Sequence, residues 1–490
     1  MKTLIQGGYV VGFNGEGHEI LRDGLVVLDN DTVSFVGFSY DDPVDKTMDA
    51  RGKLVCPGFV NTHVHANSNA GDYFLNDPGK TDYFGSNYLT YLTPGKGTAR
   101  PKGLEHFQVS GKFALVQAIK NGSTTVQIYG GGREGGDDFV DMVGELGLRA
   151  YLAPSFRNVN FYYEKSGALR CEWDDAIGDR GLEDAATFIR KHRDKYNGRI
   201  QGMLYPRQPD TCTPELLKKT KQLAKELGVG IQIHAAINLI EFHQITGRYG
   251  KTPIGFLEDI GFLGPEVILA HCVFLTGHSW TALPRGNDLE LIADSETSVS
   301  HCPLKYAKLG IALESFDRYV AEGVNVSLGT DTYPLDMAGE MRIASLVNRF
   351  VEKDYLAGSY RDVFNAATLG GAKALGREDL GRLCPGVKAD LLIVDISRTD
   401  YGAVFDPIKA FIEYGSGRDI ETVIIDGRII VDQKQFLGLD EADLVSRVQA
   451  EAEVIWGTIP DWDFLGRRAD EISPWVFPLK EPREGKAPNV

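Results

Sequence analysis

The chain has 490 residues, and its 52 lysines and arginines against 68 aspartates and glutamates give a formal net charge of −16. This acidic balance argues against binding to nucleic acid or to an anionic membrane surface, because both need a basic face. A hydrophobic content of 43% is that of a globular protein, and no apolar run reaches the roughly 18 residues that span a bilayer. The six cysteines include no Cys-x-x-Cys pair, so we predict no disulfide framework and a cytoplasmic setting.

The two ends of the chain predict short strands. Near the start, apolar runs are separated by turns that contain glycine or Asn30-Asp31. Residues 391–394, 422–425 and 429–431 form similar runs, and the Asp426-Gly427 pair before the last of them is a strong hairpin signal.

The middle of the chain alternates strand and helix. Predicted helices lie between the strands, for example at 103–120, 182–196, 214–227 and 313–322. The eight predicted strands are 55–62, 124–128, 150–153, 200–205, 229–234, 267–271, 298–301 and 325–328. Eight alternations are the number that closes a (β/α)8 barrel. An open doubly wound sheet is the alternative, but it usually carries a Gly-x-Gly-x-x-Gly loop after its first strand, which this sequence lacks. We therefore predict an α/β protein with a TIM-like barrel.

Histidines end several of these strands. His63 and His65 are two residues apart, so their side chains point to the same face of one strand. Further along the chain, three predicted strands end in histidine, and an aspartate follows the last predicted strand. These four residues are spaced by 30 or more residues, which is about one strand–helix unit. These residues are His234, His271, His301 and Asp331. Active sites of such barrels lie at the carboxyl ends of the strands.

This set of residues predicts a metal site. Neutral imidazoles and a carboxylate suit Zn²⁺, with Fe²⁺ as the second choice, and such an ion lowers the pKa of a bound water towards neutrality. A lone histidine at a strand end more often satisfies a local hydrogen bond. Five histidines at barrel spacing, together with Asp331, favour the metal site. Cys272 and Cys302 follow two of the histidines and are interpreted as small buried residues.

An ordered set of motifs carries a family resemblance over about residues 1–435. The motifs are His63-Val64-His65, His234, Leu269-Ala270-His271-Cys272-Val273, Ser300-His301-Cys302-Pro303, Leu328-Gly329-Thr330-Asp331 and residues 383–391. Together they resemble the amidohydrolase superfamily, and most closely its branch of triazine hydrolases, cytosine deaminase and adenosine-type deaminases.

The resemblance implies a domain organisation. It implies a small β-sandwich domain built from both chain ends, residues 1–56 and 383–435, beside a metal-dependent hydrolase barrel over 57–382. Residues 436–490 are then a C-terminal extension that packs on the surface. The resemblance also suggests a homo-oligomer that acts on a small-molecule substrate.

The resemblance further implies roles for the strand-end residues. One divalent ion would be held by His63, His65, His234 and Asp331. His271 would polarise the substrate or orient the water, and Asp331 would carry the proton of that water to the leaving group. Binuclear relatives use a bridging lysine on the fourth strand. Residues 200–205 contain no lysine, so we expect one metal ion.

Three departures from the family pattern bear on the substrate. Deaminases of this branch carry a ring-protonating glutamate three residues after the fifth-strand histidine, where this chain has Ile237, and Glu241 is a candidate replacement. The polar Ser and Asn that follow His-Cys-Pro in the family are replaced by Leu304, Lys305 and Tyr306. Lys305 and Tyr306, together with His301, are candidate substrate-binding residues. The long aromatic loop 66–103 is either a lid, a subunit contact or apolar packing.

These observations favour one function and leave two alternatives. The favoured function is hydrolysis of a carbon–nitrogen bond in an amide, carbamate, urea-like compound or amino-heterocycle by a metal-activated water. The first alternative is deamination or dechlorination of a nitrogen heterocycle such as a triazine, pyrimidine or purine. The second, from another class, is a non-catalytic scaffold of the same fold. Sugar hydrolysis is disfavoured because the strand ends offer mostly histidine rather than paired carboxylates.

Overall fold

The computed structural model describes residues 1–66, 104–132, 136–163, 169–462 and 466–480. Strands from the two ends of the chain form one nine-stranded sheet, with the order β21-β20-β19-β18-β5-β1-β2-β3 and with β4 paired to β1. Its strands are β1 (Lys2–Phe13), β2 (His18–Asp29), β3 (Thr32–Gly37), β4 (Lys46–Asp49), β5 (Leu54–Pro57), β18 (Leu391–Val394), β19 (Ile420–Ile425), β20 (Arg428–Asp432) and β21 (Gln435–Phe436). The two chain ends meet where β5 pairs antiparallel with β18. The strands predicted at both ends therefore belong to one β domain.

Apolar side chains from both chain ends make the core of this β domain. Ile5 and Val26 come from the first strands, and Leu391 and Ile424 come from the last ones. All four are no more than 1% exposed. The hydrogen bonds run through one continuous sheet rather than through two separate ones, so the core is enclosed by a single sheet together with the residues around Leu383.

The middle of the chain supplies two parallel sheets of four strands. The first has the order β12-β8-β7-β6 and the second the order β14-β15-β16-β17. Their strands are β6 (Phe59–Val64), β7 (Ser123–Ile128), β8 (Arg149–Leu152), β12 (Ile200–Gln201), β14 (Ile231–Ala235), β15 (Val267–His271), β16 (Ser298–His301) and β17 (Val326–Leu328). Two isolated parallel bridges, Val64 with Asp331 and Leu204 with Ile231, join the edges of the sheets. Strands thus lie at all eight predicted positions, and the chain is an α/β protein. The predicted strand 55–62 is divided between β5 and β6, and the predicted strand 200–205 is shortened to β12.

Helices follow these strands and pack around them. The helices between the strands are α2 (Leu104–Lys120), α3 (Gly136–Glu145), α4 (Asp175–His192), α5 (Lys195–Gly198), α6 (Pro214–Leu227), α7 (Leu239–Tyr249), α8 (Pro253–Asp259), α9 (Asp288–Asp294), α10 (Pro303–Ala307) and α11 (Phe316–Ala321). Those after β17 are α12 (Met337–Glu352), α13 (Tyr360–Asn365), α14 (Gly371–Ala374), α15 (Pro407–Tyr414), α16 (Glu441–Gly457), α17 (Ile459–Trp462) and α18 (Ala469–Ile472). Short strands β9 (Ser155–Phe156), β10 (Val159–Tyr163), β11 (Leu169–Trp173) and β13 (Tyr205–Pro206) complete the fold.

Helix α6 shows how the sequence sets these boundaries. Thr213 caps its start by accepting a hydrogen bond from the Leu216 N–H, and Pro214 occupies the first helical position. Gly228 ends it in the left-handed conformation, at φ 62°. Leu217 and Ala224 lie on the buried face, so the predicted helix 214–227 is confirmed.

A buried ion network joins the first parallel sheet to the β domain. Arg149, at the start of β8, is 1% exposed. Its Nε lies 3.0 Å from Asp390 Oδ2, and its Nη2 lies 3.0 Å from Asp426 Oδ1. A planar guanidinium matches two carboxylates in this way, which offsets the cost of removing the charges from water.

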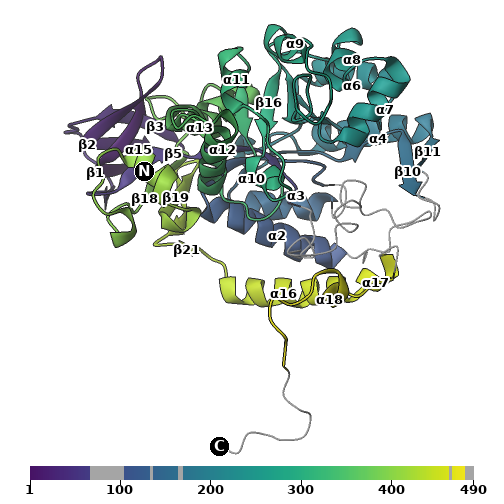
Figure 1. Ribbon diagram of the computed structural model, residues 1–490. Coiled ribbons are helices and arrows are strands. Elements are labelled where there is room, and N and C mark those ends of the chain that lie inside the picture. The colour runs from purple at the N-terminus through teal and green to yellow at the C-terminus, as the bar shows by residue number, and fades with distance from the viewer. Residues whose placement is uncertain (67–103, 133–135, 164–168, 463–465, 481–490) are drawn as a thin grey trace, which may run out of the picture.

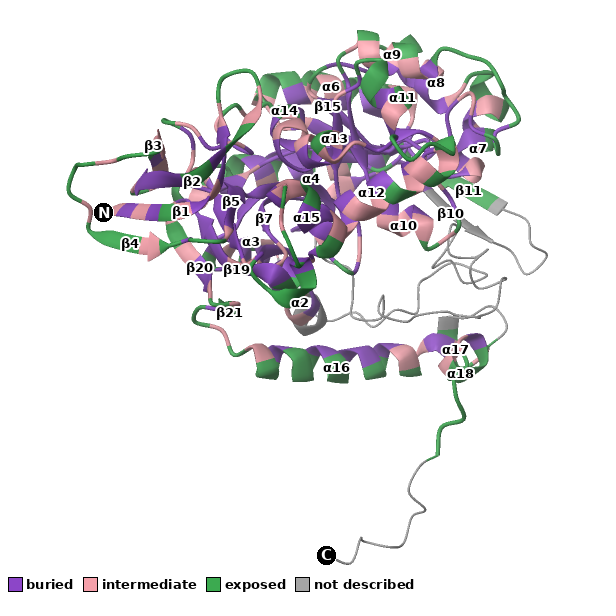
Figure 2. Ribbon diagram, turned by 60° about the vertical axis from the view of Figure 1, so that its left-hand side comes forward, coloured by how far each residue is buried: buried purple, intermediate pink, exposed green. Residues whose placement is uncertain are grey.

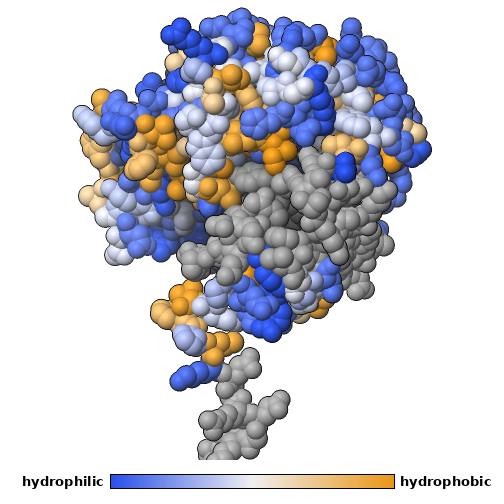
Figure 3. Space-filling view, turned by 45° about the vertical axis from the view of Figure 1, so that its right-hand side comes forward, coloured by the Kyte–Doolittle hydropathy of each residue, from blue (hydrophilic) through white to orange (hydrophobic). Residues whose placement is uncertain are grey.

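The C-terminal extension packs on α2. Val448, Ala452 and Ile455 of α16 contact Val109 and Phe113 of α2, and the buried positions of α16 form a stripe towards the body in Figure 2. Beyond α18 the chain leaves the body, where an exposed apolar segment includes residues 475–477. This segment appears as apolar surface below the body in Figure 3. Among the described residues, no helix combines the length and apolar character needed to cross a membrane.

Candidate metal centre

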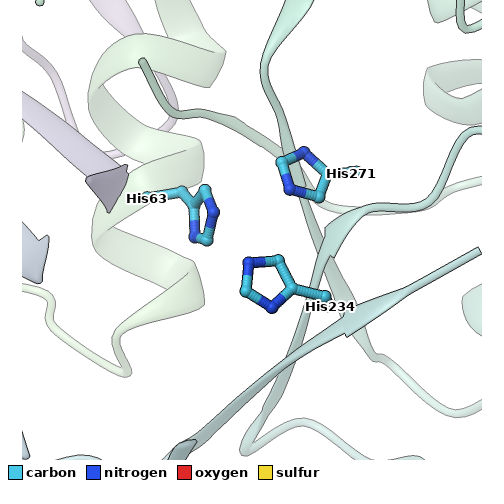
Figure 4. A group of neighbouring side chains, drawn as sticks. All are labelled: His63, His234 and His271. Carbon is cyan, nitrogen blue, oxygen red and sulfur yellow. The ribbon is translucent and has the colours of Figure 1, made fainter. Parts of the chain in front are cut away.

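The strand-end histidines meet at the carboxyl ends of the two parallel sheets. His63 lies on β6, His234 on β14 and His271 at the end of β15. Their rings point towards one another in Figure 4. Ligand atoms of these three residues lie within 4.8 Å of one another, and so do those of His63, His65 and Asp331. The predicted residues thus form one cluster with His63 at its centre.

Two hydrogen bonds orient the imidazoles of His63 and His234. His63 Nδ1 lies 2.8 Å from Gln232 Oε1, and His234 Nδ1 lies 3.1 Å from the carbonyl oxygen of Arg207. Because each acceptor takes the Nδ1 proton, the lone pair of each ring is left on Nε2. The two Nε2 atoms then face the cluster, as metal ligands do.

His65 and Asp331 are tied together through the backbone. The N–H of His65 donates to the carbonyl of Asp331, and the N–H of Asp331 donates to the carbonyl of His63, both at 2.8 Å. His65 Nε2 lies 3.6 Å from Asp331 Oδ1 and 3.3 Å from His234 Nε2. Two imidazole nitrogens and a carboxylate oxygen therefore converge on one point.

Several residues of the cluster hold an uncommon backbone conformation. His271 has φ 78° and Asp331 has φ 61°, in the left-handed region that side chains with a Cβ rarely adopt. Such strain clusters at functional sites, where the surrounding structure enforces it. Close approach also shapes the site: a Cβ at Gly329 would lie 2.6 Å from His63 Cβ, so only glycine lets the loop after β17 pass this close to β6.

The polar atoms of the cluster fit a divalent ion. Among the described residues, His63 Nε2 and both ring nitrogens of His271 are buried with no hydrogen-bond partner. An orphaned buried nitrogen costs free energy, and a metal ion removes that cost. Three imidazoles with a carboxylate are a donor set that divalent transition ions accept. The cluster is therefore suited to hold a divalent metal.

Electrostatics keep the ligands in the form that binds a metal. Burial lowers the pKa of His65 to about 3, and it lowers the pKa values of His63, His234 and His271 as well. Neutral imidazole is the ligating form. Burial by itself would raise the pKa of Asp331, but the charge of Lys305 and its hydrogen bond to the carboxylate help to lower it to about 2. Asp331 is thus an ionised carboxylate at neutral pH.

The structure also places the candidate substrate-binding residues. Lys305 Nζ forms an ion pair with Asp331 Oδ2, and the Tyr306 hydroxyl donates to the carbonyl of Ile237 at 2.9 Å. Both oxygens of Glu241 accept backbone N–H groups, those of Ala236 and Ile237, at 2.9 Å each. Glu241 is fully buried and holds the backbone after β14.

His301 lies at the end of β16, 4% exposed, with its ring 6.2 Å from that of Phe316. It is not among the residues whose ligand atoms converge with those of His63. The aromatic loop at 66–103 falls outside the described residues, except for Ala66.

Three residues of the site were not among the predicted site residues. Gln232 shares a strand face with His234, since the two are two residues apart, and this alternation was the signal that could have found it. The ring of Tyr129 lies 4.1 Å from that of His234, and its hydroxyl donates to the carbonyl of Arg207. Cys302, interpreted as a small buried residue, is indeed fully buried, but its sulfur also lies within 4.8 Å of ligand atoms of His271 and Asp331.

Comparison with known proteins gives the family. The profile of the Amidohydrolase family matches residues 54–430, so the chain belongs to this family. It is 30% identical over 455 residues to a 5'-deoxyadenosine deaminase of Methanosarcina mazei, covering 92% of this chain and 97% of that one. It is also 30% identical over 462 residues to a 5-methylthioadenosine/S-adenosylhomocysteine deaminase of Pelotomaculum thermopropionicum, covering 92% and 98%.

Solved structures share the fold. A zinc-bound adenosine deaminase from Xanthomonas campestris superposes with a TM-score of 0.76 at 23% identity, covering 92% of this chain and 98% of that one. A zinc complex of atrazine chlorohydrolase from Arthrobacter aurescens gives 0.75 at 23% identity, covering 92% and 100%. The predicted resemblance is confirmed, and the chain is a metal-dependent hydrolase that acts on carbon–nitrogen bonds.

Proposed function

We propose that this protein hydrolyses an amide, carbamate or urea-like carbon–nitrogen bond of a small molecule, with one zinc ion held by His63, His65, His234 and Asp331. The observation that carries the proposal is the convergence of these four side chains and His271, with buried nitrogens that no other described group satisfies. In this proposal the two parallel sheets form one closed eight-stranded barrel, an arrangement supported by the bridges from Val64 to Asp331 and from Leu204 to Ile231.

The residues of the chain have distinct tasks in this reaction. A divalent ion bound at this site would supply a water of lowered pKa and polarise the substrate. Asp331 would accept a proton from that water while the water oxygen bonds to the planar carbon of the substrate. The same carboxyl then delivers the proton to the leaving nitrogen as the carbon–nitrogen bond breaks. His271, whose ring nitrogens have no partner among the described residues, donates a hydrogen bond to the oxygen on which negative charge develops.

The residues after β14 favour a carbonyl substrate. Ile237 stands where deaminases of the resembling branch carry an acid, and its side chain has no proton to give to a ring nitrogen. Glu241 does not replace that acid from its present position, because both of its oxygens already accept backbone N–H groups. A carbonyl oxygen needs only polarisation by the metal and His271, so the missing acid costs little for an amide or a urea.

A second candidate is deamination of an amino-heterocycle. It is favoured by the two relatives that are 30% identical over 92% of this chain, both of which are named deaminases of adenosine derivatives. In this case another group would have to protonate the ring nitrogen, because the side chain of Ile237 carries no acid.

One experiment separates the candidates. The purified protein is assayed for metal content, then screened against amides, carbamates, ureas and aminopurines by ammonia or amine release, before and after chelation. We expect about one zinc per chain and turnover of carbonyl compounds that chelation abolishes and zinc restores. Turnover of aminopurines alone would favour the second candidate, and a protein without stoichiometric metal would contradict both.

The same preparation tests the oligomeric state and the domain boundaries. We propose a cytoplasmic homo-oligomer, divided into a β domain (1–56 and 383–435), a barrel (57–382) and an extension (436–490). Sedimentation measures the oligomeric state, and limited proteolysis measures the domain boundaries.

A further inference from the structure

Lys305 brings a positive charge to the metal centre. It lies on α10, directly after the strand that ends at His301, and its ammonium contacts Asp331 Oδ2. The side chain of Asp331 is 1% exposed, whereas that of Lys305 is 25% exposed. A partly exposed side chain therefore brings its ammonium into contact with a buried carboxylate.

The ammonium retains donors for a ligand. It has three N–H groups, and among the described residues Asp331 is the one acceptor it contacts. Its Nζ also lies 5.8 Å from the centroid of the Tyr306 ring. The Tyr306 hydroxyl donates to the Ile237 carbonyl, which helps to hold this ring in place.

A metal ion bound to Asp331 would repel the ammonium of Lys305. Asp331 already has His65 and His271 nitrogens at 3.6 Å, and it holds the ion in the proposed function. A divalent cation and an ammonium on one carboxylate repel each other, and the repulsion is strong where water is scarce. An anionic group of the substrate would remove this repulsion, whereas a neutral substrate would leave it.

Two arginines follow neighbouring strands of the same region. β9 and β13 pair in parallel through Tyr205 with Ser155 and Pro206 with Phe156, so Arg157 and Arg207 follow side by side. The N–H of Arg207 donates to Phe156 and its carbonyl accepts from His234 Nδ1, which places this pair next to the histidines. The charges of both arginines also act on the buried carboxylate of Asp210, whereas Lys305 contacts the cluster directly.

We propose that Lys305 is a specificity-determining residue that binds a negatively charged oxygen group of the substrate, so that the natural substrate is an anionic amide or urea-like compound, such as one that carries a carboxylate. This proposal rests on the proposed function. In this proposal, the side chain of Lys305 makes the difference between a hydrolase of anionic substrates and one of neutral substrates.

The test compares two probes that contain no carbon–nitrogen bond and therefore are not hydrolysed. Levulinate carries a ketone and a carboxylate, and 2,5-hexanedione has nearly the same shape with a methyl ketone in place of the carboxylate. Both are titrated by calorimetry into the zinc-loaded protein, and into Lys305→Met, Lys305→Arg and Lys373→Met. Lys373 is an exposed lysine on α14, whose neighbour Gly371 lies against Val60 near the start of β6, so its replacement controls for the loss of one charge.

We expect the unmodified protein and Lys373→Met to bind levulinate at least about tenfold more tightly than 2,5-hexanedione, a ratio that corresponds to about 1.4 kcal/mol. Lys305→Met should lose this preference, and Lys305→Arg should keep part of it. A preference that survives in Lys305→Met would mean that the carboxylate binds the metal and not Lys305, and would overturn the proposal. Equal binding of the two probes to the unmodified protein, or no binding of levulinate, would overturn it as well.

Zinc content, measured in each variant, separates this proposal from the proposed function. If zinc is bound and carbonyl compounds are hydrolysed while levulinate shows no preference, only the anion subsite is wrong. If no zinc is retained by the unmodified protein, the proposed function is wrong.

Discussion

His63 Nδ1 lies 2.8 Å from Gln232 Oε1 at the centre of the metal cluster. Gln232 is fully buried, and its amide nitrogen donates to the carbonyl of Thr62 and to Gln127 Oε1. The amide is thereby fixed in one orientation, which presents its oxygen to the imidazole. Gln232 thus acts as a positioning residue for the metal ligand His63.

Replacing Gln232 should weaken metal binding. In Gln232→Leu the imidazole of His63 loses the acceptor that sets its tautomer, and we expect the affinity for zinc to fall by about 10–100-fold. Competition with a chromogenic chelator measures this affinity. Gln201→Leu is the matched control, because Gln201 bonds to Asp194 and the Gly198 carbonyl outside the cluster. Equal zinc affinity of the two variants would contradict the assignment.

Asp331→Asn tests proton transfer. The amide keeps the shape of the side chain but accepts no proton, so we expect the fold to persist and turnover to fall by about 10²–10⁴-fold. Turnover is measured on whichever carbonyl compound the screen identifies, with zinc added in excess to offset weaker binding. A near-normal rate at full zinc occupancy would refute the proton-transfer role of Asp331.

Ile237→Glu tests whether the missing acid limits the substrate range. A carboxyl at this position would lie next to β14, where the Tyr306 hydroxyl and Glu241 hold the backbone. We expect it to confer or raise deamination of cytosine-like or triazine-like compounds, by up to about 10²–10⁴-fold where the ring must be protonated. Ile237→Gln is the control of similar shape without the acid. No gain with Glu over Gln on any such compound would weaken this account.

Arg149→Met tests the ion network under the first parallel sheet. The substitution leaves the buried Asp390 without its guanidinium, whereas Asp426 keeps its ion pair with Arg199 at 3.3 Å. Because one buried carboxylate loses its partner, we expect the free energy of unfolding to fall by about 3–5 kcal/mol. Denaturant titration followed by circular dichroism measures the change. Arg51→Met removes an exposed ion pair with Asp49 and should leave stability nearly unchanged. Similar losses in the two variants would contradict the role assigned to burial.

His18 should make stability depend on pH. Burial, together with the charge of Arg382, lowers its pKa in the folded protein from 6.5 to about 4. Since the folded state favours the neutral ring, the stabilisation is complete above pH 6.5 and is lost as the pH falls towards 4, by up to about 1.4 kcal/mol per pH unit. The difference in unfolding free energy between the unmodified protein and His18→Gln should therefore shrink over this range. Because both proteins keep the other histidines, a difference that stays constant with pH would show that His18 does not titrate in this way.

The sequence by itself determined the strand positions and the identity of the cluster. Local apolar runs marked the eight strands of the parallel sheets, because a strand buried on both faces must be apolar along its length. The carboxyl ends of parallel strands lie at the same end of the sheet. Their position therefore predicted that His63, His234 and Asp331 would meet. These predictions needed only periodicity and spacing.

The tertiary structure decided what surrounds those residues. In the sequence, Gln232 is one polar residue in a predicted strand. Its role depends on its contact with His63 of β6, a strand that is distant from β14 in the sequence. Glu241 was a candidate acid by sequence distance, but the turn into α7 directs its carboxylate to backbone N–H groups. Lys305 meets Asp331 only because α10 begins directly after β16. Contacts of this kind join residues that are distant in sequence, so they follow from packing and not from local pattern.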